Sequence, residues 1–134
     1  MCTAISYKSK DTYFGRNLDL ERGYHESVVI TPCKYPFKMR CTRSVPSHYA
    51  MIGMAKVDRG YPLYFDGTNE HGLSMAGLNF PHSAKYFIEL PGKYNIAPFE
   101  LIPWILSQCE RLDEVKHLLS NCNLVSTHFS DQLP

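Results

Sequence analysis

The apolar residues of this chain change their spacing near residue 95, and that change limits the folds that the chain can adopt. Before it, short runs rich in β-branched and aromatic residues, separated by turn-forming segments, predict strands at 2–7, 12–18, 27–32, 48–55, 62–67 and 72–80. After it, a spacing of three and four residues predicts helices. Strands followed by helices are typical of an α+β fold, so we interpret residues 1–134 as a single α+β domain.

Two helices are expected in the last third of the chain. The first begins at Pro98, which suits a first helical turn, and continues through the segment PFELIPWILSQC with a bend at Pro103. The second covers the segment RLDEVKHLLS, whose apolar residues share one stripe: Leu112, Val115, Leu118 and Leu119. Such a stripe opposite charged residues is typical of a helix that lies on a sheet.

Charge and composition argue against several functional classes. A balance of 14 basic and 13 acidic residues gives a net charge of +1, which offers no surface for nucleic acid or an anionic membrane. No long apolar run or secretion signal is visible, so we expect a cytoplasmic protein without a membrane partner. Five cysteines without a CxxC pair favour free thiols, and six scattered histidines suggest surface or turn positions. We therefore expect no metal and no cofactor.

Cys2 is the sharpest candidate for chemistry. Its small side chain should permit removal of Met1, which leaves a thiol and a free α-amine on the same residue. The reference pKa values of the two groups, about 8.5 and about 7.7 to 8.0, are close enough for a proton to pass between them near neutral pH. Cys2 would then be a nucleophile with its own base, whereas an inert packing thiol is the alternative.

A hairpin made of the first two predicted strands would bring the segment GRNLD beside this thiol. A two-residue loop sets Cys2 opposite Asn17 with Asp19 as a diagonal neighbour, and a three-residue loop sets Cys2 opposite Arg16. Either register offers a carboxylate to hold an ammonium group and a guanidinium to favour the thiolate. The alternative interpretation is a surface ion pair between Arg16 and Asp19.

Four segments resemble, in order, signature segments of the choloylglycine hydrolase family, which includes bile salt hydrolases and penicillin V acylases. These segments are MCTAISY, YFGRNLDL, YPLYFDGTNEHGLSMAGLNFP and NIAPFELIPWIL, and the resemblance runs from residue 1 to residue 134. It implies an N-terminal-nucleophile hydrolase fold, the αββα sandwich, of which this chain covers roughly the first half. Half a sandwich would expose sheet edges and an apolar face.

The resemblance implies roles for four residues. Cys2 is the nucleophile, Arg16 supports its thiolate, Asp19 holds the α-amine, and Asn79 contributes to the oxyanion hole. The implied reaction is hydrolysis of the amide bond of glycine or taurine conjugates of bile acids through a thioester. Asn79 resembles bile salt hydrolases, because penicillin V acylases tend to carry an aromatic residue there. A penicillin V acylase and a truncated, non-catalytic remnant that only binds ligand are the alternatives.

Further candidates concern the substrate and the assembly. Leu18, Leu20 and Phe65 are candidates to line an apolar pocket for the steroid body, with core packing as the alternative for each. Glu70 and His71, in the segment DGTNEHG, are interpreted as part of a solvated turn and not as an acid/base pair. The resemblance also implies a homo-oligomer, a tetramer, of bacterial origin.

Overall fold

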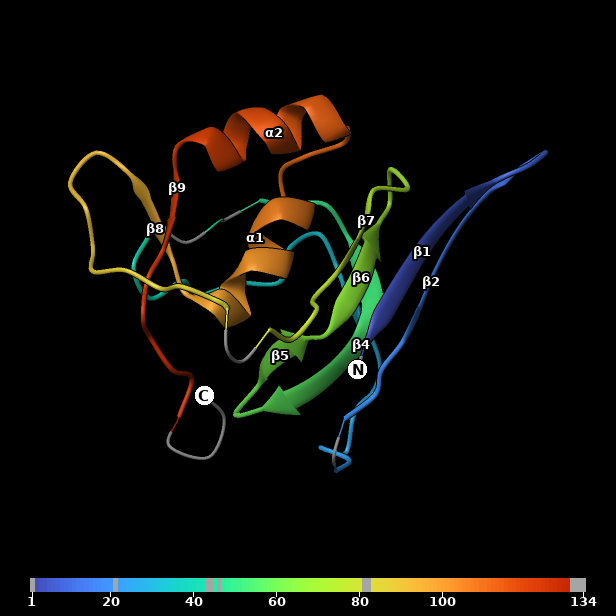
Figure 1. Ribbon diagram of the computed structural model, residues 1–134, viewed down its shortest axis with the longest axis horizontal. Helices are drawn as coiled ribbons and strands as arrows, with labels where there is room; N and C mark the ends of the chain where they lie inside the picture. Colours follow the sequence, from blue (N-terminus) through green and yellow to red (C-terminus); the bar gives the residue numbers. More distant parts are fainter. Residues whose placement is uncertain (1, 21, 43–44, 46, 81–82, 131–134) are drawn as a thin grey trace.

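The computed structural model describes residues 2–20, 22–42, 45, 47–80 and 83–130. In Figure 1 a central antiparallel sheet is covered on one face by a helix, and a separate hairpin lies along its other face. The elements are, in chain order, β1 (Thr3–Lys8), β2 (Thr12–Asn17), β3 (Ser27–Thr31), β4 (Met51–Asp58), β5 (Tyr61–Tyr64), β6 (Asp66–Asn69), β7 (Ser74–Ala76), β8 (Tyr94–Ile96), a 3₁₀ turn (Pro98–Glu100), α1 (Leu101–Leu106), α2 (Leu112–Ser120) and β9 (Cys122–Leu124).

Strand β4 organises the central sheet, whose order is β3-β4-β6-β7 with β5 also paired to β4. Its second half, Ala55–Asp58, pairs with β5, and its first residues, Met51 and Ile52, pair with β6. A two-residue turn with positive φ at Arg59 and Gly60 joins β4 to β5, which is the geometry of a tight hairpin. The change of partner occurs beside Gly53.

The core lies between this sheet and α1, which contacts β6 and β7. Its fully buried large side chains include Phe37, Ile96, Ile105 and Leu106. Asn69 of β6 ties the sheet to the end of α1, because its amide nitrogen donates hydrogen bonds to the carbonyl oxygens of Leu106 and Cys109 at 2.9 and 2.7 Å. The two layers are therefore held by apolar burial and by a buried amide.

Both predicted helices are present, and each differs from the prediction. The first is a 3₁₀ turn followed by a six-residue α-helix, so Pro103 lies in the first α-helical turn, where its missing N–H breaks no intrahelical hydrogen bond. In α2, Val115 and Leu118 pack against the core, as the stripe predicts. Leu112 and Leu119 are 68% and 42% exposed, so half of the predicted stripe faces outward.

The predicted strand at 27–32 is confirmed, whereas others shift. The strand expected at 48–55 runs from Met51 to Asp58, and the one expected at 72–80 shrinks to three residues. The segment DGTN, which we interpreted as the start of a turn, is strand β6. The parallel pair β8–β9 was not predicted, because each strand has three residues and its partner lies far along the chain.

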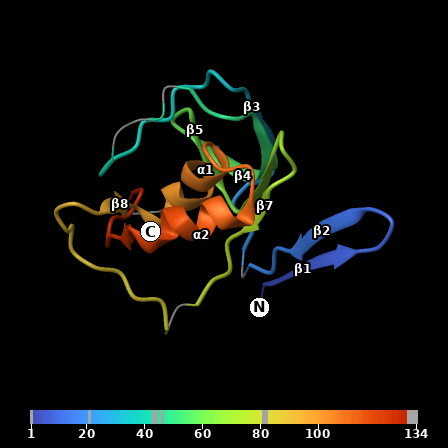
Figure 2. The same ribbon diagram turned by 90° about the horizontal axis from the view of Figure 1, so that it is seen from above.

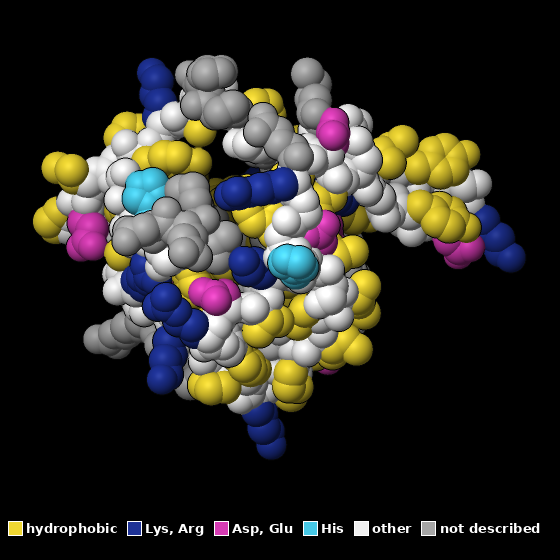
Figure 3. Space-filling view, turned by 90° about the horizontal axis from the view of Figure 1, so that it is seen from below, with side chains coloured by type: hydrophobic (Ala, Val, Ile, Leu, Met, Phe, Trp, Pro, Cys, Tyr) yellow, Lys and Arg dark blue, Asp and Glu magenta, His cyan; other side chains and the backbone are white. Residues whose placement is uncertain are grey.

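The sheet face opposite α1 carries the exposed apolar side chains expected of half a sandwich. Val28 and Ile30 of β3 are 65% and 70% exposed, and Ile52 of β4 is 46% exposed. The hairpin β1–β2 forms an arm beside this face (Figure 2), with exposed apolar residues along it (Figure 3). No helix in the described ranges has the length and apolar character needed to cross a membrane.

Candidate active site

The hairpin β1–β2 forms as predicted, but in neither predicted register. Its pairs run from Thr3–Asn17 to Lys8–Thr12, which leaves a three-residue loop over positions 9–11. Within that loop the Ser9 amide donates a hydrogen bond to the Asp11 carbonyl oxygen, so the second strand resumes one residue later than we expected. Continued by one residue, the register sets Cys2 level with Leu18, and not with Asn17 or Arg16.

This register still brings Arg16 to the same side of the hairpin as Cys2. Arg16 pairs with Ala4, and paired residues share a face, as do residues two apart along a strand. Cys2 is therefore a diagonal neighbour of Arg16 on that face. Its Sγ also lies 3.7 Å from the main-chain oxygen of Asp19, to which the thiol donates.

Arg16 reaches from the hairpin to the sheet, where its side chain is only 6% exposed. Its Nη2 donates a 2.6 Å hydrogen bond to the Gly77 carbonyl oxygen, and its Nε lies 3.6 Å from Oδ2 of Asp66. Its Nη1 is buried without a hydrogen-bond partner among the described residues. A buried guanidinium thus keeps one set of N–H donors available for a ligand or a thiolate.

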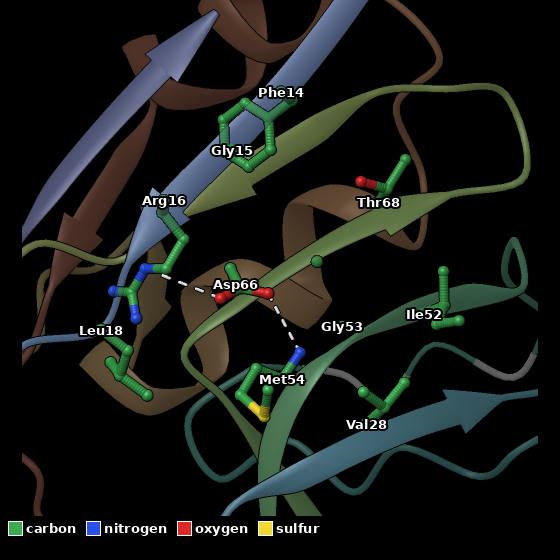
Figure 4. A pocket seen from close by; sticks show the side chains of 11 residues that line it. Phe14, Gly15, Arg16, Leu18, Val28, Ile52, Gly53, Met54, Asp66 and Thr68 are labelled. Carbon is green, nitrogen blue, oxygen red and sulfur yellow. Dashed lines mark hydrogen bonds and ion pairs between the residues drawn. The ribbon is translucent and has the colours of Figure 1, made fainter.

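A cavity of about 500 Å³ lies between the hairpin and the sheet (Figure 4). The hairpin contributes alternate residues of one face, Phe14, Arg16 and Leu18, and the sheet contributes side chains of β3, β4 and β6, among them Val28 and Asp66. This volume is within the usual range of small-molecule sites. The cavity is mostly apolar, with one buried ion pair at its wall.

The structure places the other predicted site residues less centrally. Asn79 is exposed, two residues beyond Gly77, and no hydrogen bond joins it to Cys2 or Arg16 within the described part of the chain. Leu18 lines the cavity, whereas Leu20 and Phe65 are not among its lining residues. Phe65 instead lies beside Tyr24, with ring centroids 6.4 Å apart. Met1, whose removal we predict, lies outside the described residues.

Asp66 is the residue of this site that sequence reasoning missed. It belongs to DGTNEHG, a segment whose composition indicated a turn. Its signal is visible in retrospect, because Asp66 begins a strand and Thr68, two residues later, lines the same cavity. The rest of the segment lies elsewhere: Glu70 accepts the Ala50 N–H at 2.8 Å, and Nε2 of His71 lies 3.6 Å from Glu110.

The remaining thiols have poorer surroundings for nucleophilic chemistry. All five cysteines are free, and burial raises the pKa of Cys41, Cys109 and Cys122, which disfavours their thiolates. Cys33 is exposed and lies away from the cavity. One histidine contradicts the surface prediction, because His48 is buried with its ring nitrogens against the carbonyl oxygens of Tyr35 and Tyr49.

Comparison with known proteins decides the family. The model of the linear amide C–N hydrolases, choloylglycine hydrolase family, matches residues 2–133. The chain belongs to this family. It is 51% identical over 134 residues to a bile salt hydrolase/transferase of Lactiplantibacillus plantarum, covering all of this chain and 41% of that protein. It is 43% identical over 129 residues to a conjugated bile acid hydrolase of Lactobacillus acidophilus, covering 94% of this chain and 41% of that protein.

Solved structures agree with this assignment. Two variants of the conjugated bile acid hydrolase of Clostridium perfringens superpose with TM-scores of 0.86 and 0.87 at 34% and 33% identity. One has alanine in place of cysteine at position 2, and the other has leucine in place of an arginine. All of this chain is covered, and 42% of each solved chain. The α+β, N-terminal-nucleophile hydrolase fold is thus confirmed, and the chain spans about two fifths of the length of its relatives.

Proposed function

We propose that this chain carries the nucleophile-bearing part of an amidase that hydrolyses conjugated bile salts, with Cys2 as nucleophile. The observation that carries the proposal is the buried Arg16 guanidinium, which has unpartnered Nη1 donors on the hairpin face that it shares with Cys2. The apolar cavity beside it suits a steroid body, and the names of the relatives support bile salts as the substrate class.

The first half of the reaction forms a thioester. After Met1 is removed, the α-amine of Cys2 accepts the thiol proton as the sulfur attacks the amide carbonyl carbon. The positive charge of Arg16 favours the thiolate, and Asp19 holds the α-ammonium. Asn79 donates to the oxyanion of the tetrahedral intermediate. The C–N bond then breaks, and glycine or taurine leaves with the proton from the α-ammonium.

The second half of the reaction returns the thiol. A water molecule attacks the thioester carbonyl, and the free α-amine takes its proton. The C–S bond breaks, the bile acid leaves as a carboxylate, and Cys2 is protonated again. Leu18 contacts the steroid body in this scheme, since it lines the cavity, while Leu20 and Phe65 stay predictions without such support.

Amine release tests the proposal directly. The chain, shown by intact mass to lack Met1, is incubated with glycocholate and with taurocholate, and free glycine or taurine is measured. We expect release by the unmodified chain and by Cys33→Ala, and none by Cys2→Ala. Competition by penicillin V at equal concentration would instead favour the acylase alternative. Release by Cys2→Ala equal to that of the unmodified chain would refute Cys2 as nucleophile.

A ligand-binding chain that does not turn over is the second candidate, favoured by its coverage of only 41% of its relatives and by the exposure of Asn79. Tight binding of glycocholate without amine release or a covalent adduct at Cys2 would support it. Free thiols at all five cysteines suit the reducing cytoplasm, which we propose as its location. A tetramer, also proposed, is measurable by light scattering.

A further inference from the structure

We infer that Asp66 is a positioning residue that holds the Arg16 guanidinium next to Cys2; this inference rests on the proposed function. The two carboxylate oxygens of Asp66 face different parts of the fold. Oδ2 lies 3.6 Å from Nε of Arg16, and Oδ1 accepts the main-chain N–H of Met54 at 3.0 Å (Figure 4). The carboxylate therefore joins the hairpin to the sheet.

The main chain of Asp66 is held as firmly as its side chain. A Cβ at Gly53 would meet the Asp66 main-chain oxygen and would lie only 2.8 Å from its carbonyl carbon, so β4 and β6 approach more closely than any other residue type would permit. At the same point the hydrogen bond from Met54 orients the carboxylate. Asp66 thus keeps its place without help from Arg16, as a positioning group requires.

The charge of Asp66 matters because of where Arg16 lies. The Arg16 side chain is 6% exposed and the Asp66 side chain 17%, so water solvates the guanidinium poorly. Burying an unpaired cation is expensive, and Asp66 is the single carboxylate within ion-pair distance of Arg16 in the described ranges. Without it, the arginine would be driven to turn toward solvent and away from Cys2.

The contacts also orient the guanidinium. Asp66 lies on the Nε side, and the Gly77 carbonyl oxygen takes a hydrogen bond from Nη2. These two contacts leave Nη1 without a partner, which is the nitrogen then available to the thiolate of Cys2. Asp66 therefore acts through Arg16 and does not itself touch the reacting atoms.

The test measures the reactivity of Cys2 and needs no turnover. Alkylation of each cysteine by iodoacetamide is followed from pH 5 to 10 by peptide mass spectrometry, with the exposed Cys33 as an internal reference. For Asp66→Asn we expect Cys2 alkylation at pH 7 to fall about tenfold and its pH midpoint to rise by about one unit. The rate at Cys33 should not change. Asp58→Asn is the matched control, because Asp58 pairs with the exposed Arg59 at 3.9 Å.

Each outcome separates the two ideas. If Cys2 of the unmodified chain reacts no faster than Cys33, the proposed function fails. If Cys2 shows the advantage and Asp66→Asn keeps the same midpoint, the inference about Asp66 fails alone. Asp66→Glu, which retains the charge, should keep Cys2 reactivity within about threefold. This second variant decides the question if Asp66→Asn does not fold, since a folded Glu variant without the Cys2 advantage overturns the inference.

Discussion

Replacing Gly53 with alanine should destabilise the sheet by forcing β4 and β6 apart. The added Cβ would lie 2.6 Å from Cα of Gly67 and 2.8 Å from the carbonyl carbon of Asp66, and both of these atoms belong to backbone. Ordinary contact begins at 3.4 Å, so the strands would have to separate by about 0.8 Å at the point where β4 changes partner. No side-chain rotation can relieve such a contact.

We expect the free energy of unfolding to fall by about 3 kcal/mol, the upper end of the usual cost of overpacking, because the clash involves backbone. For a chain of 134 residues this corresponds to a decrease in Tm of about 10 °C. The assay is urea unfolding followed by the fluorescence of Trp104, the single tryptophan, which is 3% exposed. Displacement of Asp66 should also slow the alkylation of Cys2.

Gly15→Ala provides the matched control in the same cavity wall. Gly15 is also a strand residue, but its added Cβ would meet no atom closer than Cγ2 of Ile5 at 3.9 Å, which is ordinary contact. Its stability should change by less than about 1 kcal/mol, in either direction. If Gly53→Ala unfolds within about 0.5 kcal/mol of the unmodified chain, then β4 and β6 are not in backbone contact at this point, and the reasoning is wrong.

Three further substitutions test other parts of the fold. Burial raises the pKa of Glu100, so the folded chain binds this proton more tightly than the unfolded chain, and stability should fall as pH rises from 4.5 through the higher folded value; Glu100→Gln should flatten that slope in urea titrations between pH 4 and 8. Asn69→Ala should cost about 2 to 4 kcal/mol in the same assay, because four buried main-chain groups lose their partner. Thr31→Val should cost about 1 kcal/mol by leaving the Tyr64 hydroxyl without its 2.6 Å partner.

Clear results would contradict each of these expectations. An unchanged pH slope in Glu100→Gln would mean that other groups produce the acid dependence. A loss below about 1 kcal/mol in Asn69→Ala would mean that water replaces the amide at the end of α1. For Thr31→Val, no change relative to Thr3→Val, an exposed threonine of the hairpin, would show that the buried hydroxyl pair contributes nothing.

Local patterns predicted the hairpin and the face that it presents, but not its register. Alternation along β2 is a property of the strand itself, so Phe14, Arg16 and Leu18 necessarily share a side. The register depends on which loop residues hydrogen-bond, and the contact between Ser9 and Asp11 moved it by one position. A pattern of apolar residues is unchanged by such a shift within a polar loop, and so it could not reveal the contact.

Helix positions were also easier to predict than helix environments. The stripe in α2 correctly indicated a helix over residues 112–120, because a spacing of three and four residues reflects the turn of the helix. Which half of the stripe becomes buried depends on what the rest of the fold places beside it. Val115 and Leu118 meet the core, whereas Leu112 stays exposed.

The sequence by itself determined the α+β order of elements, the family, and Cys2 with Arg16 as the candidate reactive pair, because these follow from local spacing and from motifs. Only the tertiary structure decided that Asp66 meets Arg16, fifty positions away, and that Gly53 makes room for it. The physical reason is that an ion pair between distant residues depends on how the hairpin and the sheet pack. No periodicity along the chain encodes that distance, and the fold supplies it by burying both charges in one wall.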